Sequence, residues 1–183
     1  MTSSTKGILA MIGSCIIWGL SSLIYKQLSD VPAIEVLAHR TLWSFVFFVV
    51  LLGVQGRLRD IRGSFSDRRS ATLTVLAALM ILANWFLFIW SIETERATQA
   101  SLGYYIYPLV SVVLGWSIFG EKLARLQWSA IALAAAAVSA LTYGLGGAPW
   151  ISLTLAGTFA IYGLLKKQLS VGPVVSVTAE VTL

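Results

Sequence analysis

Long apolar runs dominate the chain, and short polar segments separate them. A transmembrane helix needs about 20 predominantly apolar residues. Six runs approach or reach this length: Gly7–Leu28, Ala33–Gly53, Ala71–Ile92, Ala97–Phe119, Ala124–Tyr143 and Trp150–Leu165. A seventh run begins after Pro173 and continues to Leu183. The pattern predicts an all-α integral membrane protein with six transmembrane helices plus a partial seventh.

The composition agrees with this class and excludes several others. Of the 183 residues, 57% are hydrophobic and 11% are charged, whereas a soluble domain has about 45–50% apolar and about 25% charged residues. A water-soluble enzyme and a nucleic-acid-binding protein are therefore excluded. One cysteine (Cys15) and one histidine (His39) leave no disulfide and no cysteine or paired-histidine metal site. We expect no cofactor, no metal and no enzymatic activity.

The positive charges predict the orientation in the membrane. Lys and Arg accumulate on the cytoplasmic side of membrane proteins. Ten of the 13 lie on the N-terminal side: Lys6, Arg57, Arg59, Arg62, Arg68, Arg69, Lys122, Arg125, Lys166 and Lys167. Lys26, Arg40 and Arg96 lie on the other side. We expect a multi-pass protein of the plasma (inner) membrane with a cytoplasmic N-terminus.

The chain also contains an internal repeat. The segment 26–42 (KQLSDVP…TL) matches the segment 167–183 (KQLSVGP…TL) at nine of seventeen ungapped positions, with an offset of 141. The sixth run therefore corresponds to the first, and the repeat unit has five helices. Because five is odd, the second copy enters the membrane inverted, which is typical of secondary transporters.

This repeat divides the chain into two parts. Residues 1–143 form a first five-helix repeat, and residues 144–183 begin a second, incomplete repeat of a ten-helix bundle. We expect the fifth helix to pack through an alanine ridge at Ala132, Ala136 and Ala140. We also expect the sixth helix to pack loosely near the first, because the helices of its own repeat are missing. Self-association, or a separate second half, would complete the bundle.

Several motifs together resemble the RarD group of EamA-type permeases in the drug/metabolite transporter superfamily. They are Ile17-Trp18-Gly19, His39-Arg40, the string from Asn84 to Trp90, the string from Ala100 to Leu109, Gly120-Glu121 and Tyr162-Gly163-Leu164. The resemblance covers the whole chain. It implies a ten-helix inner-membrane carrier built from two inverted EamA repeats, in a group named for chloramphenicol sensitivity.

Polar and aromatic residues on the first and sixth helices are candidates for lining a cavity. Ser14, Trp18, Ser21 and Tyr25 share one helical face, and Thr154, Thr158 and Tyr162 repeat this spacing in the sixth helix. The alternative is that these residues only support helix packing and anchor the helix at the membrane interface.

The second helix carries His39 and Arg40 about two turns from its outer end. A charge at membrane depth costs at least about 2.5–3.5 kcal/mol and is rarely without function. Arg40 is a candidate for binding an anionic or carbonyl-bearing cargo, and His39 for exchanging protons. Alternatively, Arg40 extends outward and pairs with Glu35 or Glu93.

Helices three and four hold the remaining candidates. Asn84 lies in the middle of the third helix, where it either bonds a neighbouring helix or contacts cargo. Ser101, Tyr104 and Pro108 share a face of the fourth helix. Pro108 should kink this helix and free the carbonyl of Tyr104. These residues extend the candidate substrate-binding set.

Together these features favour a secondary permease that moves small metabolites or drugs, such as chloramphenicol-like compounds, by alternating access. We expect an exporter, with the lipid bilayer, a small-molecule substrate and a coupling ion such as the proton as its partners. A small multidrug exporter driven by a carboxylate in the first helix is disfavoured, since no Asp or Glu lies between Lys6 and Asp30. The alternative from another class is a truncated, non-transporting membrane scaffold or pseudogene product.

Overall fold

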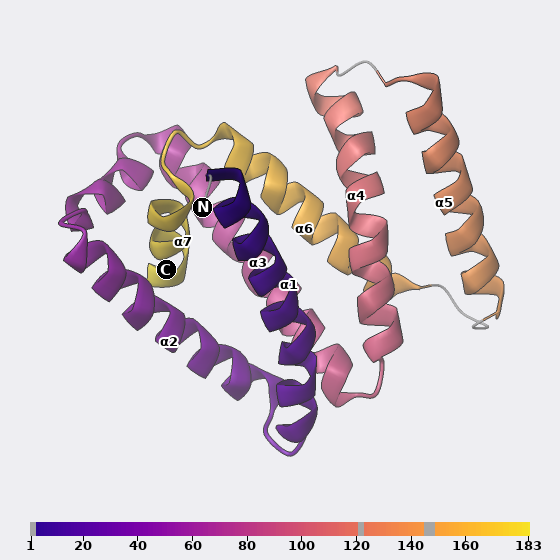
Figure 1. The fold of residues 1–183 in the computed structure, drawn as a ribbon, viewed down its shortest axis with the longest axis horizontal. Helices are drawn as coiled ribbons and strands as arrows, with labels where there is room; N and C mark the ends of the chain where they lie inside the picture. The colour runs from indigo at the N-terminus through magenta and orange to yellow at the C-terminus, as the bar shows by residue number, and fades with distance from the viewer. Residues whose placement is uncertain (1–2, 121–122, 145–148) are drawn as a thin grey trace.

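The described part of the chain is helical and contains no strand. The structure is a computed structural model that describes residues 3–120, 123–144 and 149–183 (Figure 1). Its helices are α1 (Ser3–Gln27), α2 (Ala33–Val54), the 3-10 helix η1 (Leu58–Phe65), α3 (Arg68–Glu93), α4 (Ala97–Phe119), α5 (Arg125–Gly144), α6 (Trp150–Gln168) and α7 (Pro173–Thr182). The all-α class predicted from the apolar runs is confirmed.

Four of these helices are long and apolar enough to cross a membrane: α1, α2, α3 and α4. Helix α6 ends in Lys166-Lys167-Gln168, which shortens its apolar stretch. Helix α7 has ten residues, about half of the roughly 20 that a span requires. The chain is a multi-pass membrane protein, and membrane crossing by α5 and α6 stays a prediction.

Local sequence signals fix where the helices begin and end. Asp67 caps α3: its Oδ1 accepts a hydrogen bond from the backbone N–H of Ser70 at 3.0 Å, and its Oδ2 accepts one from the Ser70 hydroxyl at 2.8 Å. Helix α4 ends at Gly120, whose φ of 64° is the left-handed conformation typical of glycine at this position. Glu121, which accompanies Gly120 in the family motif, lies outside the described residues.

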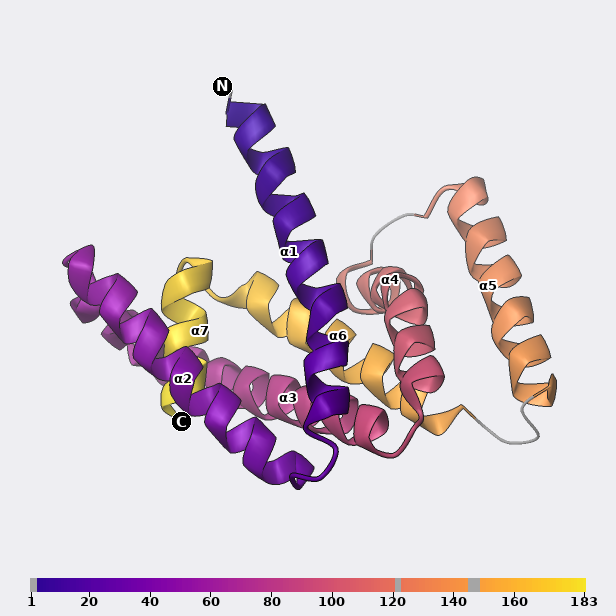
Figure 2. The same ribbon diagram turned by 60° about the horizontal axis from the view of Figure 1, so that its bottom comes forward.

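Helix α3 is the central element. In its most apolar segment 39% of residues are buried, compared with 17% in α2 and α4 and none in α1. It contacts α1, α2, η1, α4, α6 and α7. Figure 2 shows α7 toward one end of α3 and α4 toward the other, while α6 runs along α3 between them. Side chains on the buried face of α3 therefore reach several helices at once.

The expectation that the sixth helix packs loosely near the first is wrong. Helix α6 packs most extensively against α4 and α3, and no contact joins it to α1 among the described residues. The close approach depends on Gly103 in α4, where a Cβ atom would lie 2.9 Å from both the Cβ of Leu155 and the carbonyl oxygen of Ser152. Because Gly103 lies opposite the turn of α6 that contains Ser152 and Leu155, the backbones of α4 and α6 can approach each other. The internal repeat alone does not predict this contact.

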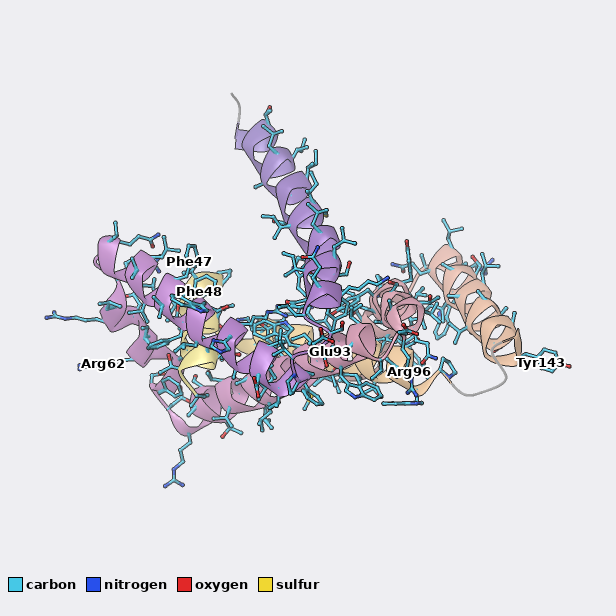
Figure 3. All side chains as sticks on the ribbon, turned by 90° about the horizontal axis from the view of Figure 1, so that it is seen from below. Phe47, Phe48, Arg62, Glu93, Arg96 and Tyr143 are labelled. Carbon is cyan, nitrogen blue, oxygen red and sulfur yellow. The ribbon has the colours of Figure 1, made fainter. Side chains whose placement is uncertain are left out.

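Helices α1 and α5 lie at the periphery. Helix α5 contacts α4 alone among the described elements, through the Trp116 and Trp128 rings at 5.2 Å. The alanine ridge of α5 is exposed, so the packing role expected for it is wrong. At the end of α5, Tyr143 is 91% exposed and points away from the other helices (Figure 3). The apolar surfaces of both helices are free to face lipid.

Candidate functional site

Aromatic side chains from α1, α3 and α4 meet in one cluster. The Trp18 ring lies 6.0 Å from both Phe88 and Tyr104, and Phe88 lies 5.6 Å from Tyr104. Tyr25, two turns after Trp18, contacts Phe88 edge-on at 6.0 Å. We call these four residues the aromatic cluster. Their edge-to-face arrangement is the one that aromatic quadrupoles favour.

A cavity of about 540 Å³ opens beside the aromatic cluster. It is bounded by side chains from four helices: Trp18, Gly19 and Ser22 of α1, Phe88 and Ile92 of α3, Ala97, Ser101, Tyr104 and Tyr105 of α4, and Phe159 of α6. Small-molecule pockets typically measure about 300–1,000 Å³ and combine an apolar wall with a few polar groups. This cavity has that size and that composition.

Arg40 of α2 lies against two tryptophans at the edge of the cluster. Its guanidinium carbon is 4.0 Å from the centre of the Trp85 ring and 5.6 Å from that of Trp18. These cation–π contacts hold the charge in an apolar region. The terminal nitrogen Nη1 is buried and has no hydrogen-bond partner among the described residues. A buried donor without a partner costs free energy, and Arg40 itself lines none of the described cavities.

The structure does not support the alternative in which Arg40 pairs with a carboxylate. Among the described residues, no ion pair joins Arg40 to Glu35 or Glu93. The phenol of Tyr25 lies beside the guanidinium instead. The arginine thus belongs to the aromatic cluster.

Asn84 joins the aromatic cluster to α6. Its amide nitrogen donates to the carbonyl oxygen of Leu155 and to the hydroxyl of Thr158, both at 2.9 Å. Its amide oxygen accepts a hydrogen bond from the Tyr104 hydroxyl at 3.0 Å. Asn84 is fully buried, so these bonds lie away from water. Of the two readings of Asn84, the structure shows the interhelical bond, and this bond also fixes the orientation of the Tyr104 ring.

The structure brings most, but not all, of the sequence-derived site residues together. Those that meet at the aromatic cluster, its cavity or its polar support are Trp18, Tyr25, Arg40, Asn84, Ser101 and Tyr104. His39 and Pro108 are exposed and line none of the described cavities next to the cluster. The kink expected at Pro108 stays a prediction, since α4 runs without a break from Ala97 to Phe119.

Tyr162 lies in a second polar group. Its hydroxyl donates to Oε2 of Glu180 at 2.9 Å, and its ring stacks on Phe159 at 6.0 Å. Phe159 in turn contacts Tyr104 at 5.9 Å. Tyr162 therefore reaches the aromatic cluster only through another ring.

Sequence reasoning missed Phe159 and Glu180. Nothing in the spacing of Phe159 sets it apart from other apolar residues of α6, because its role depends on α6 packing against α4. Glu180 had a signal, since it is a lone carboxylate in an apolar segment and corresponds to His39 in the repeat.

Known proteins show which family has a sequence like that of this chain. A profile of the EamA-like transporter family matches residues 5–143. The chain belongs to the EamA-like transporter family. Similar proteins are RarD from Streptomyces exfoliatus, 44% identical over 174 residues, and an uncharacterized transporter from Vibrio cholerae, 42% identical over 166 residues. RarD from Escherichia coli K12 is 37% identical over 166 residues. Within the EamA family, the chain is thus similar to proteins named RarD.

The coverage of these relatives is uneven. The alignments include 95%, 91% and 91% of this EamA family member, but only 55%, 55% and 56% of the respective relatives. The chain therefore spans about half the length of the curated relatives it matches. No solved structure matches it.

Proposed function

We propose that this chain acts in a secondary permease that moves small amphipathic metabolites or drugs across the plasma membrane by alternating access, in the direction of export. The observation that carries the proposal is the aromatic cluster with Arg40 beside it. A cavity of about 540 Å³ inside a set of apolar helices suits a drug-sized molecule. The EamA-like transporter family itself, and the relative from Vibrio cholerae that is named a transporter, support the same class.

The chemistry of the site suggests what the cargo carries. The edge-to-face rings of Trp18, Phe88 and Tyr104 favour a cargo with a flat apolar or aromatic part. The free Nη1 of Arg40 favours a carbonyl or carboxylate oxygen on the same molecule. Chloramphenicol, with an aromatic ring and an amide carbonyl, belongs to this class of compound.

The proposal includes a topology and partners. We place the N-terminus in the cytoplasm, because ten of the 13 basic residues lie on that side. We further propose that a coupling ion drives transport, and that the helices completing the bundle come from a second copy or a second half.

Binding and transport by the purified full chain would test the proposal. We would measure uptake of labelled chloramphenicol and related compounds into proteoliposomes with imposed gradients, and binding from quenching of tryptophan fluorescence. In Arg40→Met, a carbonyl-bearing cargo should bind about tenfold more weakly or worse, because a hydrogen bond to a charged group contributes about 1.5–3 kcal/mol. An analogue that lacks the carbonyl should bind with unchanged affinity.

Two control variants separate the site from general effects. His39→Gln changes the neighbouring exposed residue and Trp43→Phe an indole that is 66% exposed on the same helix, so neither should alter binding. Absence of both binding and transport across a broad panel would contradict the proposal and favour a non-transporting scaffold. Equal losses for both cargo types in Arg40→Met would contradict the role of Arg40.

A further inference from the structure

A buried charge cluster joins α6 and α7, separate from the aromatic cluster. Oε1 of Glu180 accepts hydrogen bonds from Nζ of Lys166 at 2.7 Å and from the Ser176 hydroxyl at 2.8 Å. Oε2 accepts a hydrogen bond from the Tyr162 hydroxyl at 2.9 Å. Lys166 also contacts the Ser176 hydroxyl. The carboxylate side chain is only 2% exposed, so its charge depends on these partners.

Packing alone does not explain this arrangement. The cluster lies among apolar residues of the two helices, such as Ala160, Val175 and Ala179, which are all buried. Replacing a buried ion pair by apolar side chains of similar volume is often neutral or stabilising. A buried ionisable pair that packing does not require is a candidate for function, and ion and proton pathways are a common setting for such groups in membrane proteins.

Glu180 also borders a cavity that Trp85 of α3 lines as well. The cavity has a volume of about 310 Å³, and Thr41, Trp85 and Glu180 are among the residues that line it. The same Trp85 ring carries the Arg40 guanidinium on its face at 4.0 Å. The Trp85 indole thus contacts the Arg40 guanidinium and lines the same cavity as the Glu180 carboxylate.

Few other charges face this carboxylate. On α6 these are Lys166 and Tyr162. On α3, Arg69 donates to the Gln168 side chain at the end of α6, and the part between residues 71 and 92 contains no titratable side chain. On α2, Arg40 lies against the Trp85 ring, while His39 is exposed. The charged residues of the η1 region, Arg57, Arg59 and Asp60, border the N-terminal end of α7 together with Val171, Gly172 and Val175.

We propose that Glu180 is the proton-binding residue of this protein and that Lys166, Tyr162 and Ser176 hold its deprotonated form. Its role in coupling rests on the proposed transport function, but the proton site itself does not. One proton from water adds to the Glu180 carboxylate and forms the neutral acid, while Lys166 keeps its ammonium charge. The cluster changes from net neutral to net positive, and no other bond is made or broken.

This change of charge supplies a switch. Once Glu180 is neutral, the Lys166 ammonium has lost its counter-ion in an apolar region. Lys166 lies in the last turn of α6 and its side chain is 19% exposed, so its flexible stem lets the ammonium move outward to water. The contact between α6 and α7 weakens as a result, next to the cavity that both Trp85 and Glu180 line.

Infrared difference spectroscopy on the purified full chain tests the proton site without any cargo. Acidification should produce the C=O band of a protonated carboxylic acid that is absent from the spectrum of Glu180→Gln. The matched control Glu35→Gln, which removes an exposed carboxylate, should keep this band. Glu180→Asp should keep the C=O band but show it at a different pH. This variant provides the test if Glu180→Gln does not fold. Identical spectra for the unchanged chain and Glu180→Gln would overturn the proposal.

Transport measurements test the coupling. In proteoliposomes, Glu180→Gln should lose accumulation driven by a pH gradient and retain exchange of cargo at equal pH. Equal loss of accumulation and exchange, with a lowered melting temperature, would show a purely structural ion pair and overturn the inference. If the Glu180 band titrates but no cargo moves, the proposed function fails and the proton site stands. If cargo moves without dependence on a pH gradient and the band is absent, the proton site fails and the proposed function stands.

Discussion

At the scale of single residues, Asn84 shows how one amide organises the candidate site. Its three hydrogen bonds reach Leu155, Thr158 and Tyr104, so it links α3 to both α4 and α6. Each interhelical hydrogen bond in a membrane protein contributes on average only about 0.6 kcal/mol. Losing the amide also leaves the buried Tyr104 hydroxyl without an acceptor, which adds a separate penalty.

We expect Asn84→Ala to lower the free energy of unfolding by about 1–3 kcal/mol, the range for a buried polar group left without a partner. Tyr104→Phe removes one of the three bonds and should cost less. Thermal unfolding of the purified chain in detergent measures both. Thr72→Val, which removes an exposed hydroxyl bonded only within its own helix, should change stability by less than about 0.5 kcal/mol. A similar loss for Thr72→Val and Asn84→Ala would contradict this role of Asn84.

The chemical type of the residues predicted some members of the candidate site but not the side chains that they contact. Trp18, Tyr25 and Arg40 are unusual at membrane depth, so their chemistry alone identifies them as candidates, and the structure brings them together. Their partners could not be predicted, because Phe88 and Phe159 look like any other apolar residues of a span. The role of His39 stays a prediction: its chemistry suggests one, but its side chain is exposed and lines none of the described cavities.

At the scale of helices, the contact between α4 and α6 depends on small residues. Gly103 faces the turn of α6 that contains Ser152 and Leu155. The Ser152 hydroxyl donates to the carbonyl oxygen of Gln99 one turn earlier on α4. Helices that approach this closely exclude any side chain larger than hydrogen at the crossing point.

We predict that Gly103→Ala destabilises the protein by about 1–3 kcal/mol, the typical cost of overpacking. The added methyl group would meet the backbone of α6 at 2.9 Å, and a backbone cannot move aside as a flexible side chain can. Gly157→Ala in α6 is the matched control, since a Cβ there meets nothing within 4 Å. It should leave stability unchanged or raise it by about 0.5–1 kcal/mol. Equal melting temperatures for the two variants would contradict the close crossing.

The stability of the first turn of α3 should depend on pH. The backbone and hydroxyl hydrogen bonds from Ser70 hold the pKa of the Asp67 carboxyl below its ordinary value. Because the folded-state pKa is depressed, the cap stabilises α3 above the pKa of the unfolded chain, about 3.9. This contribution is lost as the pH falls through the folded-state value.

We therefore expect Asp67→Ala to reduce the hydrogen-exchange protection of the first amides of α3 at neutral pH. Asp67→Asn should keep the protection at neutral pH and remain protected in acid, because the neutral amide is also a good cap. The unchanged chain should lose protection only in acid, after correction for the intrinsic exchange rate. Equal acid sensitivity of the unchanged chain and Asp67→Asn would contradict this assignment.

The elements themselves were largely predictable, and their packing was not. Apolar runs of about 20 residues are needed to cross a bilayer, so the positions of α1 to α4 follow from sequence alone. The place of α6 depends on which surfaces fit together, and Gly103 reveals its importance only when Leu155 lies opposite. The same applies to α5, whose alanine ridge faces no described helix.

At the scale of the whole molecule, charge is distributed unevenly between the two ends of the spans. The connection between α2 and α3 contains Arg57, Arg59 and Arg62, and α3 begins with Arg68 and Arg69. Figure 3 shows Arg62 extending from this end, whereas Glu93 and Arg96 mark the turn between α3 and α4. Positive loops remain in the cytoplasm during insertion, so the connection that contains η1 should be cytoplasmic.

Cysteine accessibility in intact cells tests this orientation. Cys15 is the only cysteine of the chain, so Cys15→Ser provides a background without thiols. In this background Ser66→Cys should react with a membrane-impermeant maleimide only after the cells are opened, whereas Thr94→Cys should react in intact cells. Both positions are exposed. The reverse pattern of labelling would contradict the cytoplasmic N-terminus.

The position of α1 has a consequence for the route by which cargo arrives. Helix α1 leans away from the other helices (Figure 2): its backbone comes close to that of α3 but not to that of α4 among the described elements, and it reaches α4 through the Trp18 and Tyr104 rings. The side chains of Ser101 and Tyr105, on the exposed side of α4, line the cavity between the two helices. We expect this gap to face the acyl chains of a bilayer and to act as a lateral portal for cargo. A compound dissolved in one leaflet would enter sideways, and its rate of capture would follow its oil–water partition coefficient rather than its aqueous concentration.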